Sequence, residues 1–196
     1  MKIFSYFLIL LFLSSCNTTH YFVISKSHTE GIDFSSGKWL IGDISVNPYA
    51  KDKITNLVLK DFSEYLGERV KYSLVEKSLL LPQQVRLNPS KSTILDLKKG
   101  ADFDYYVNIK CKNAKNDLSD FDFADHFYYK KQMSFAEVTL QVYDLNLGEI
   151  IYSQTVGGSI EDDNSFTNKP TTTIILGTYN KIINDIKEKS IKPVAK

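Results

Sequence analysis

Residues 134–156, SFAEVTLQVYDLNLGEIIYSQTV, decide the fold because they contain two strand-like runs joined by a tight turn. Apolar and polar side chains alternate from Ser134 to Tyr143, and a second run rich in β-branched residues extends from Ile150 to Val156. Asp, Asn and Gly occur together between these runs, which is typical of a hairpin loop. The stretch therefore predicts two adjacent antiparallel strands.

The spacing of apolar residues outside this hairpin changes between strand and helix periods. Residues 39–46 (WLIGDISV) predict a buried strand, which Asn47-Pro48 ends. Residues 50–66 then carry apolar side chains at three- and four-residue steps before Gly67, a pattern that predicts an amphipathic helix with a glycine stop. Further elements are predicted in order: a strand over 70–75, a helix from Asn88-Pro89 to Lys99, a strand over 105–112 and a helix over 171–191.

This order, β-α-β-α-β-β-β-α, predicts an α/β (α+β) fold with a single mixed sheet of about five strands flanked by helices. One globular domain is expected over residues 39–192, and the short run 20–25 (HYFVIS) is compatible with a further strand. The formal net charge of the 196 residues is +1. Without a basic excess to bind phosphates, a nucleic-acid partner is not expected.

The first sixteen residues predict export. Met1-Lys2 precedes an apolar run from Ile3 to Leu13, and Ser14-Ser15-Cys16 follows. This layout indicates a signal peptide over 1–15. The Leu-Ser-Ser-Cys end resembles the lipobox of bacterial lipoproteins, which implies cleavage before Cys16 and acylation of that residue. Residues 16–38 are then expected to be a lipidated N-terminus and tether. The alternative is an uncut anchor, although the apolar run is shorter than the ~20 residues that span a bilayer.

The body of the chain also resembles a family. Residues 100–107 (GADFDYYV) and the hairpin residues 138–145 (VTLQVYDL) and 148–153 (GEIIYS) resemble motifs of periplasmic lipoproteins related to the curli-secretion channel protein. Relatives of that group include the lipoprotein activator of a penicillin-binding protein. The resemblance implies a soluble, lipid-tethered domain that contacts other envelope proteins. The motifs shape turns and fill the sheet, and they carry no catalytic residue.

One loop carries the candidate partner-binding residues. Residues 113–131 are polar and acidic, and aromatic side chains are interleaved with the acids. Exposed aromatic rings supply rigid contact area, and carboxylates add specificity. Calcium binding is an alternative, but the turn glycine and closing glutamate of a calcium loop are missing. The simplest interpretation is an ordinary hairpin loop without a binding role. The contact hypothesis names Asp120, Phe121, Asp122, Phe123, Asp125, His126, Phe127 and Tyr128.

Two functional hypotheses follow. The first is a non-enzymatic outer-membrane lipoprotein that faces the periplasm, without a cofactor or metal, and docks to a secretion, polysaccharide or cell-wall complex. The sequence lacks the HExxH, CxxC pair, G-x-S-x-G and phosphate-loop motifs, so no catalytic residue is named. The alternative is a small periplasmic hydrolase or ligand-binding lipoprotein, which a deep pocket with converging polar groups would favour. A homo-oligomer is a further possibility, and Cys111 is expected to be a buried, inert thiol.

Overall fold

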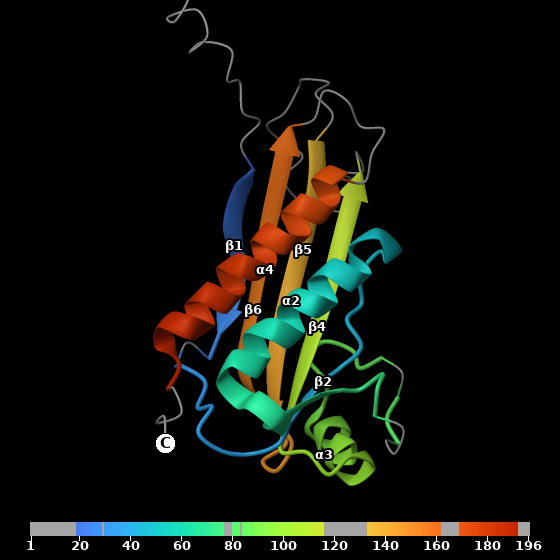
Figure 1. Ribbon diagram of the computed structural model, residues 1–196, viewed down its shortest axis with the longest axis vertical. Helices are drawn as coiled ribbons and strands as arrows, with labels where there is room; N and C mark the ends of the chain where they lie inside the picture. Colours follow the sequence, from blue (N-terminus) through green and yellow to red (C-terminus); the bar gives the residue numbers. More distant parts are fainter. Residues whose placement is uncertain are drawn as a thin grey trace, which may run out of the picture.

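The computed structural model describes residues 19–28, 30–76, 80–82, 84–115, 133–161 and 169–191. This part of the chain forms one six-stranded mixed sheet, in the order β1-β6-β5-β4-β2-β3, with helices α2 and α4 side by side across one face (Figure 1). The α/β class and the single mixed sheet are confirmed. The elements are β1 (His20–Ser27), β2 (Trp39–Ile41), α2 (Pro48–Leu66), a 3-10 turn η1 (Gly67–Arg69), β3 (Val70–Tyr72), α3 (Lys91–Gly100), β4 (Tyr105–Lys115), β5 (Met133–Asp144), β6 (Glu149–Glu161) and α4 (Lys169–Lys189).

The predicted hairpin forms the middle of the sheet. Strands β5 and β6 pair antiparallel, with Asp144 opposite Glu149 at the turn. Gly148 takes a φ of 71°, a left-handed conformation that a glycine adopts without steric cost. Strand β4 pairs antiparallel with the other side of β5, and β2 joins β4 and β3 through parallel pairing. The consecutive strands of the C-terminal half therefore carry the antiparallel part, and the helix-separated strands carry the parallel part.

Strand β1 lies inside the segment that the sequence assigned to the tether. It runs antiparallel to β6 from His20 opposite Ser159 to Ser27 opposite Ser153. The chain then reaches the far end of α4, where the amide of Ile191 donates to the carbonyl of Ile32 at 3.1 Å. Residues 20–28 and 30–38 of the expected tether thus pack on the sheet and on the last helix.

Several predicted bounds differ from the structure; for example, the strand expected over 70–75 ends at Tyr72. Two of the differences have a local reason. The strand expected over 39–46 is interrupted after Ile41. The five residues from Ile41 to Ser45 run beside only four of β4, Val107 to Lys110, so the chain bulges before Ser45 pairs again. Helix α3 begins at Lys91 with Ser90 as its N-cap, so the predicted start of this helix at Asn88-Pro89 is wrong. Asn88 has a φ of 49°, and its backbone amide donates instead to Gln141 of β5.

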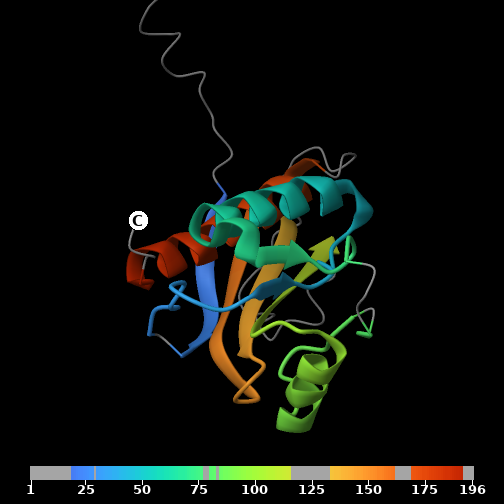
Figure 2. The same cartoon turned by 60° about the horizontal axis from the view of Figure 1, so that its bottom comes forward.

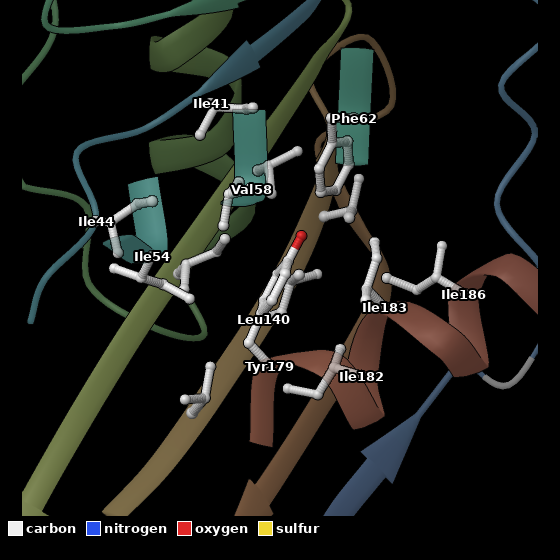
Figure 3. Close-up of a cluster of buried hydrophobic side chains, with 14 of the residues drawn as sticks. Ile41, Ile44, Ile54, Val58, Phe62, Leu140, Tyr179, Ile182, Ile183 and Ile186 are labelled. Carbon is white, nitrogen blue, oxygen red and sulfur yellow. The ribbon is translucent and has the colours of Figure 1, made fainter. Parts of the chain in front are cut away.

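The larger core lies between α2, α4 and the sheet (Figure 3). The buried stripe predicted for the last helix is confirmed, since Ile175, Tyr179, Ile182 and Ile186 are each at most 1% exposed. They meet the apolar face of α2, which presents Ile54, Val58 and Phe62, above Leu140 of β5. In the described part of the chain, no helix is both long and apolar enough to cross a membrane.

A smaller core covers one end of the opposite face of the sheet. Ile94 and Leu97 of α3 pack there against Leu40, Tyr106 and Tyr143. Figure 2 shows α3 on this side, away from α2 and α4 and near the β5–β6 turn. Because α3 is short, it covers only this end, and the rest of the face is left to polar side chains.

Candidate functional site: a polar cavity on the second face of the sheet

A cavity of about 400 Å³ lies on the part of the second face that α3 leaves uncovered. Alternate residues of a strand point to the same face, so side chains from the four neighbouring strands β1, β6, β5 and β4 meet here with those of the turn before α3. Hydroxyl and amide groups predominate among them. The lining residues are Ile24, Ser25, Ser27, Leu87, Asn88, Lys112, Glu137, Thr139, Gln141, Ser153 and Thr155.

Gln141 is the centre of this site. Its side chain is only 1% exposed. Its Oε1 accepts hydrogen bonds from the backbone amide of Asn88 at 3.0 Å and from the hydroxyl of Tyr143 at 2.9 Å. Its Nε2 donates to Asn88 Oδ1 at 2.6 Å and to Ser153 Oγ at 3.0 Å. All four hydrogen-bonding positions of the amide are thus used, which fixes its orientation.

Asn88 is held against β5 in an unusual backbone conformation. Its φ of 49° lies in the left-handed region, which asparagine tolerates better than most residues with a side chain. The paired bonds between Asn88 and Gln141, from backbone amide to Oε1 and from Nε2 to Oδ1, hold it there. The turn before α3 is therefore shaped by a residue 53 positions away in the sequence.

A second buried amide extends the network beneath the turn. Asn108 Nδ2 donates to the hydroxyl of Tyr143 at 2.8 Å and to the carbonyl of Val85 at 3.2 Å. Burial raises the pKa of Tyr143 to about 12, and the hydrogen bond from Asn108 opposes that rise only in part. Tyr143 is therefore a neutral donor at physiological pH, and it connects the two amides into one network.

The other end of the cavity carries a hydroxyl pair and an ion pair. Thr139 Oγ1 and Thr155 Oγ1 are 2.9 Å apart across β5 and β6. Lys112 Nζ lies 3.2 Å from Glu137 Oε1, and the glutamate side chain is 12% exposed while the lysine side chain is 73% exposed. The cavity thus offers neutral polar groups along its length and one charge-balanced pair at its edge.

This arrangement suits binding better than nucleophilic chemistry. A serine or threonine nucleophile needs an adjacent general base that takes its proton. The hydroxyls of Thr139 and Thr155 bond to each other, and Ser153 Oγ accepts from the Gln141 amide. Within the described residues, no group of three His, Cys, Asp or Glu side chains is placed to hold a metal ion.

The residues that the sequence analysis singled out are elsewhere. Cys16 and the loop residues Asp120, Phe121, Asp122, Phe123, Asp125, His126, Phe127 and Tyr128 lie outside the described residues. Cys111 is partly buried against the larger core, and burial raises the pKa of its thiol to about 12. The cavity residues were missed because Thr139, Gln141, Ser153 and Thr155 alternate with apolar neighbours, as on any half-solvated sheet face.

Comparison with known proteins gives likenesses of fold. No protein-family model matches the chain, and no curated protein sequence matches it. The lipoprotein GNA1162 from Neisseria meningitidis is similar over 76% of this chain and 99% of its own, with 12% identity and a TM-score of 0.45. The PelC dodecamer from Paraburkholderia phytofirmans covers 82% of this chain and 95% of its own, with 11% identity and a TM-score of 0.41. The hypothetical protein CT253 from Chlamydia trachomatis covers 79% and 97%, with 10% identity and a TM-score of 0.44.

Proposed function

We propose that this chain is a lipid-anchored envelope protein that faces the periplasm from the outer membrane and acts as a non-enzymatic docking or assembly accessory. In this proposal Cys16 carries the lipid and the folded domain makes the contacts with other envelope proteins. The observation that carries the proposal is the position of β1, an edge strand that begins at His20, four positions after the lipidation site.

The attachment of β1 to the domain makes the tether short. Lys26 Nζ of this strand lies 2.5 Å from Asp185 Oδ1 of α4. Tyr21 packs so close to Gly158 of β6 and Gly177 of α4 that a Cβ on either glycine would overlap its ring. Four extended residues reach about 14 Å at most, so a lipid on Cys16 would hold β1 within that distance of the bilayer. A domain held this way works at the membrane surface.

The apolar side chains on β1 indicate what kind of partner it meets. Phe22, Val23 and Ile24 are 39%, 58% and 46% exposed, although they are consecutive and apolar. A break in the β1–β6 register between Val23 and Ser25 disturbs the edge, which disfavours the addition of another strand. The proposed occupant is therefore an apolar side-chain surface on a membrane-associated envelope protein, and the tether raises the effective concentration of both partners.

Site-specific crosslinking in intact cells tests this proposal. A photoreactive residue at Val23 is expected to crosslink to an envelope protein, and the same residue at Lys60, which is exposed on α2, is expected not to. Replacing Cys16 with serine is expected to release the chain from the membrane fraction and abolish the Val23 crosslink. Retention of the Cys16→Ser chain in membranes, or equal crosslinking from Val23 and Lys60, would contradict the proposal.

A deletion tests whether partner binding depends on β1 or on the segment that the sequence predicted as the contact surface. Residues 117–129 are not part of β1, so the Val23 crosslink is expected to persist in a chain that lacks them. Loss of a partner's copurification in that deletion, with the crosslink retained, would assign a second contact to the loop. Copurification that is unchanged would exclude the loop as a contact surface.

A further inference from the structure

We propose that the polar cavity beside Gln141 binds a neutral, hydroxyl-rich ligand, a saccharide unit, a role that goes beyond docking to envelope proteins. Four features of the cavity carry this assignment: its charge balance, its unused hydrogen-bonding groups, its rigidity and its apolar rim. Its volume of about 400 Å³ lies within the range of about 300–1,000 Å³ that is usual for small-molecule sites.

The charge balance favours a neutral ligand. The charged side chains that line the cavity are Lys112 and Glu137, and they pair with each other at 3.2 Å. Sites for carboxylates or phosphates generally present unbalanced cations, with Arg as the most effective donor. A cationic ligand would likewise need a carboxylate free of its lysine. The remaining polar lining groups are hydroxyls and amides.

Within the described residues, the cavity has hydrogen-bonding groups without a partner, and the hydroxyls of a sugar could bond to them. Ser153 Oγ accepts from Gln141, so its own hydrogen stays available to a ligand. In the Thr139–Thr155 pair one hydroxyl donates to the other, which leaves the second hydrogen free. Asn88 uses its backbone amide and Oδ1 on Gln141, and no described residue accepts from its Nδ2. Sugar hydroxyls both donate and accept, so they can satisfy all of these groups.

The cavity is rigid before any ligand binds. Gln141 is fixed by its four hydrogen bonds, and its pairing with Asn88 holds the left-handed turn. Side chains already fixed by the fold lose little conformational entropy on binding. Left-handed residues other than glycine are often found at ligand-binding sites, where the surrounding structure maintains the strain.

An apolar rim completes the match. Ile24 and Leu87 line the cavity, and they can pack against the C–H face of a sugar ring. Phe22 and Phe135 are next on the same face of β1 and β5, with ring centroids 6.1 Å apart. Aromatic rings beside polar groups give a saccharide both stacking area and hydrogen bonds.

Binding to defined oligosaccharides tests the proposal. The full chain is purified in a detergent without a sugar head group and titrated with N,N′-diacetylchitobiose, cellotriose and maltotriose, which are neutral, and with trigalacturonate, which is anionic. Calorimetry and saturation-transfer NMR are expected to show saturable binding of at least one neutral sugar and weaker binding of the anionic one. No saturable binding of any neutral sugar, or tighter binding of trigalacturonate, would overturn the proposal.

Three substitutions connect binding to the cavity. Asn88→Gly keeps the left-handed backbone and removes the amide, Thr155→Val removes a hydroxyl at nearly constant shape, and Ser153→Ala removes another. Each is expected to raise the Kd by about tenfold. Ser63→Ala, on the exposed face of α2, is the matched control and is expected to change nothing. Circular dichroism establishes which variants fold, and sugar binding unchanged in the folded ones would place the ligand elsewhere and overturn the assignment.

Discussion

Lys26 Nζ lies 2.5 Å from Asp185 Oδ1, and this ion pair joins the edge strand next to the proposed lipid anchor to the last helix. Asp185 also accepts from Lys189 at 2.9 Å and from the hydroxyl of Tyr152 at 3.1 Å. The side chains of Lys26 and Asp185 are 18% and 19% exposed, so solvent screens their attraction only in part. The aspartate thus connects β1, β6 and α4 at one point.

Replacing Asp185 with asparagine should destabilise the protein by about 1–3 kcal/mol near neutral pH, because it removes charge-assisted hydrogen bonds. Burial by itself would raise the pKa of Asp185, but hydrogen bonds from Lys26 and Lys189 outweigh it and lower the pKa. The contribution is therefore present above the unfolded-state pKa, ~3.9, and is lost as the pH falls through the lower folded-state value. Urea unfolding of wild type and Asp185→Asn across this range should show the difference shrinking in acid.

Asp96→Asn is the matched control for this prediction. Asp96 pairs with Lys99 on the surface of α3, with side chains 67% and 77% exposed. Exposed pairs of this kind contribute about 0–1 kcal/mol, so the control should change stability little at any pH. A loss equal to that of Asp185→Asn, or an Asp185→Asn difference that stays constant into acid, would contradict the role assigned to Asp185.

A second ion pair joins the two helices that cover the sheet. Lys187 Nζ of α4 lies 2.6 Å from Asp61 Oδ1 of α2, whose side chain is 9% exposed. The hydrogen bond to Asp61 is the main reason that the pKa of Lys187 is raised. Lys187→Met leaves a buried carboxylate without its cation and should cost about 3–5 kcal/mol, whereas Asp61→Asn leaves a lysine that can reach water and should cost less.

The double variant distinguishes charge from packing at this pair. If Lys187→Met destabilises the protein because the buried Asp61 carboxylate loses its cation, adding Asp61→Asn should restore part of the lost stability. The measurement is chemical unfolding of the two single variants and the double variant, read as a double-mutant cycle. Additive effects of the two substitutions would mean that the pair contributes through packing alone.

Local patterns determined how much of the fold was predictable. The hairpin around Gly148 and the buried stripe of α4 follow from turn residues and helical spacing, so they were visible in the sequence. The start of α3 was misplaced because Asn88-Pro89 has the composition of a helix cap. Asn88 is instead hydrogen-bonded to the side chain of Gln141, 53 positions away in the sequence. A pattern confined to residues 88–91 cannot reveal such a distant partner.

The cavity was harder to predict for the same reason. Thr139 and Gln141 alternate with Val138 and Leu140, which predicts a half-polar strand without saying which polar groups converge. Their convergence with Ser153 depends on the β5–β6 register, which places Gln141 directly opposite it. It also depends on how far α3 covers the face. Both are long-range properties of the folded chain.

The thiol of Cys111 should be slow to react in the native protein. Burial raises its pKa to about 12, so the thiolate, which is the reactive species, is scarce at neutral pH. In the Cys16→Ser chain, alkylation by iodoacetamide should be on the order of a hundredfold slower in the folded than in the urea-unfolded state. The folded-state rate should keep rising with pH through the range in which an ordinary thiol levels off. Equal rates in the two states would show that the thiol is accessible and ionisable.

Gly31 should be intolerant of any side chain, because its position fixes the chain after β1 against the end of α4. A Cβ at Gly31 would overlap the backbone carbonyl of Lys189, and backbone moves less readily than the end of a side chain. Gly31→Ala should therefore cost about 1–3 kcal/mol. The amides of Ile191 and Phe34 donate across this contact, to the carbonyls of Ile32 and Ile191 at 3.1 and 3.3 Å. Both amides should lose hydrogen-exchange protection in Gly31→Ala. Gly67→Ala is the control: a Cβ added there would meet no described atom within 4 Å apart from those of its own stretch of chain, and the φ of 54° is strained for alanine. Gly67→Ala should lower the free energy of unfolding by about 1–2 kcal/mol and leave the amides of Ile191 and Phe34 protected. Loss of protection in both variants alike would mean that Gly31 acts through global stability and not through its contact with α4.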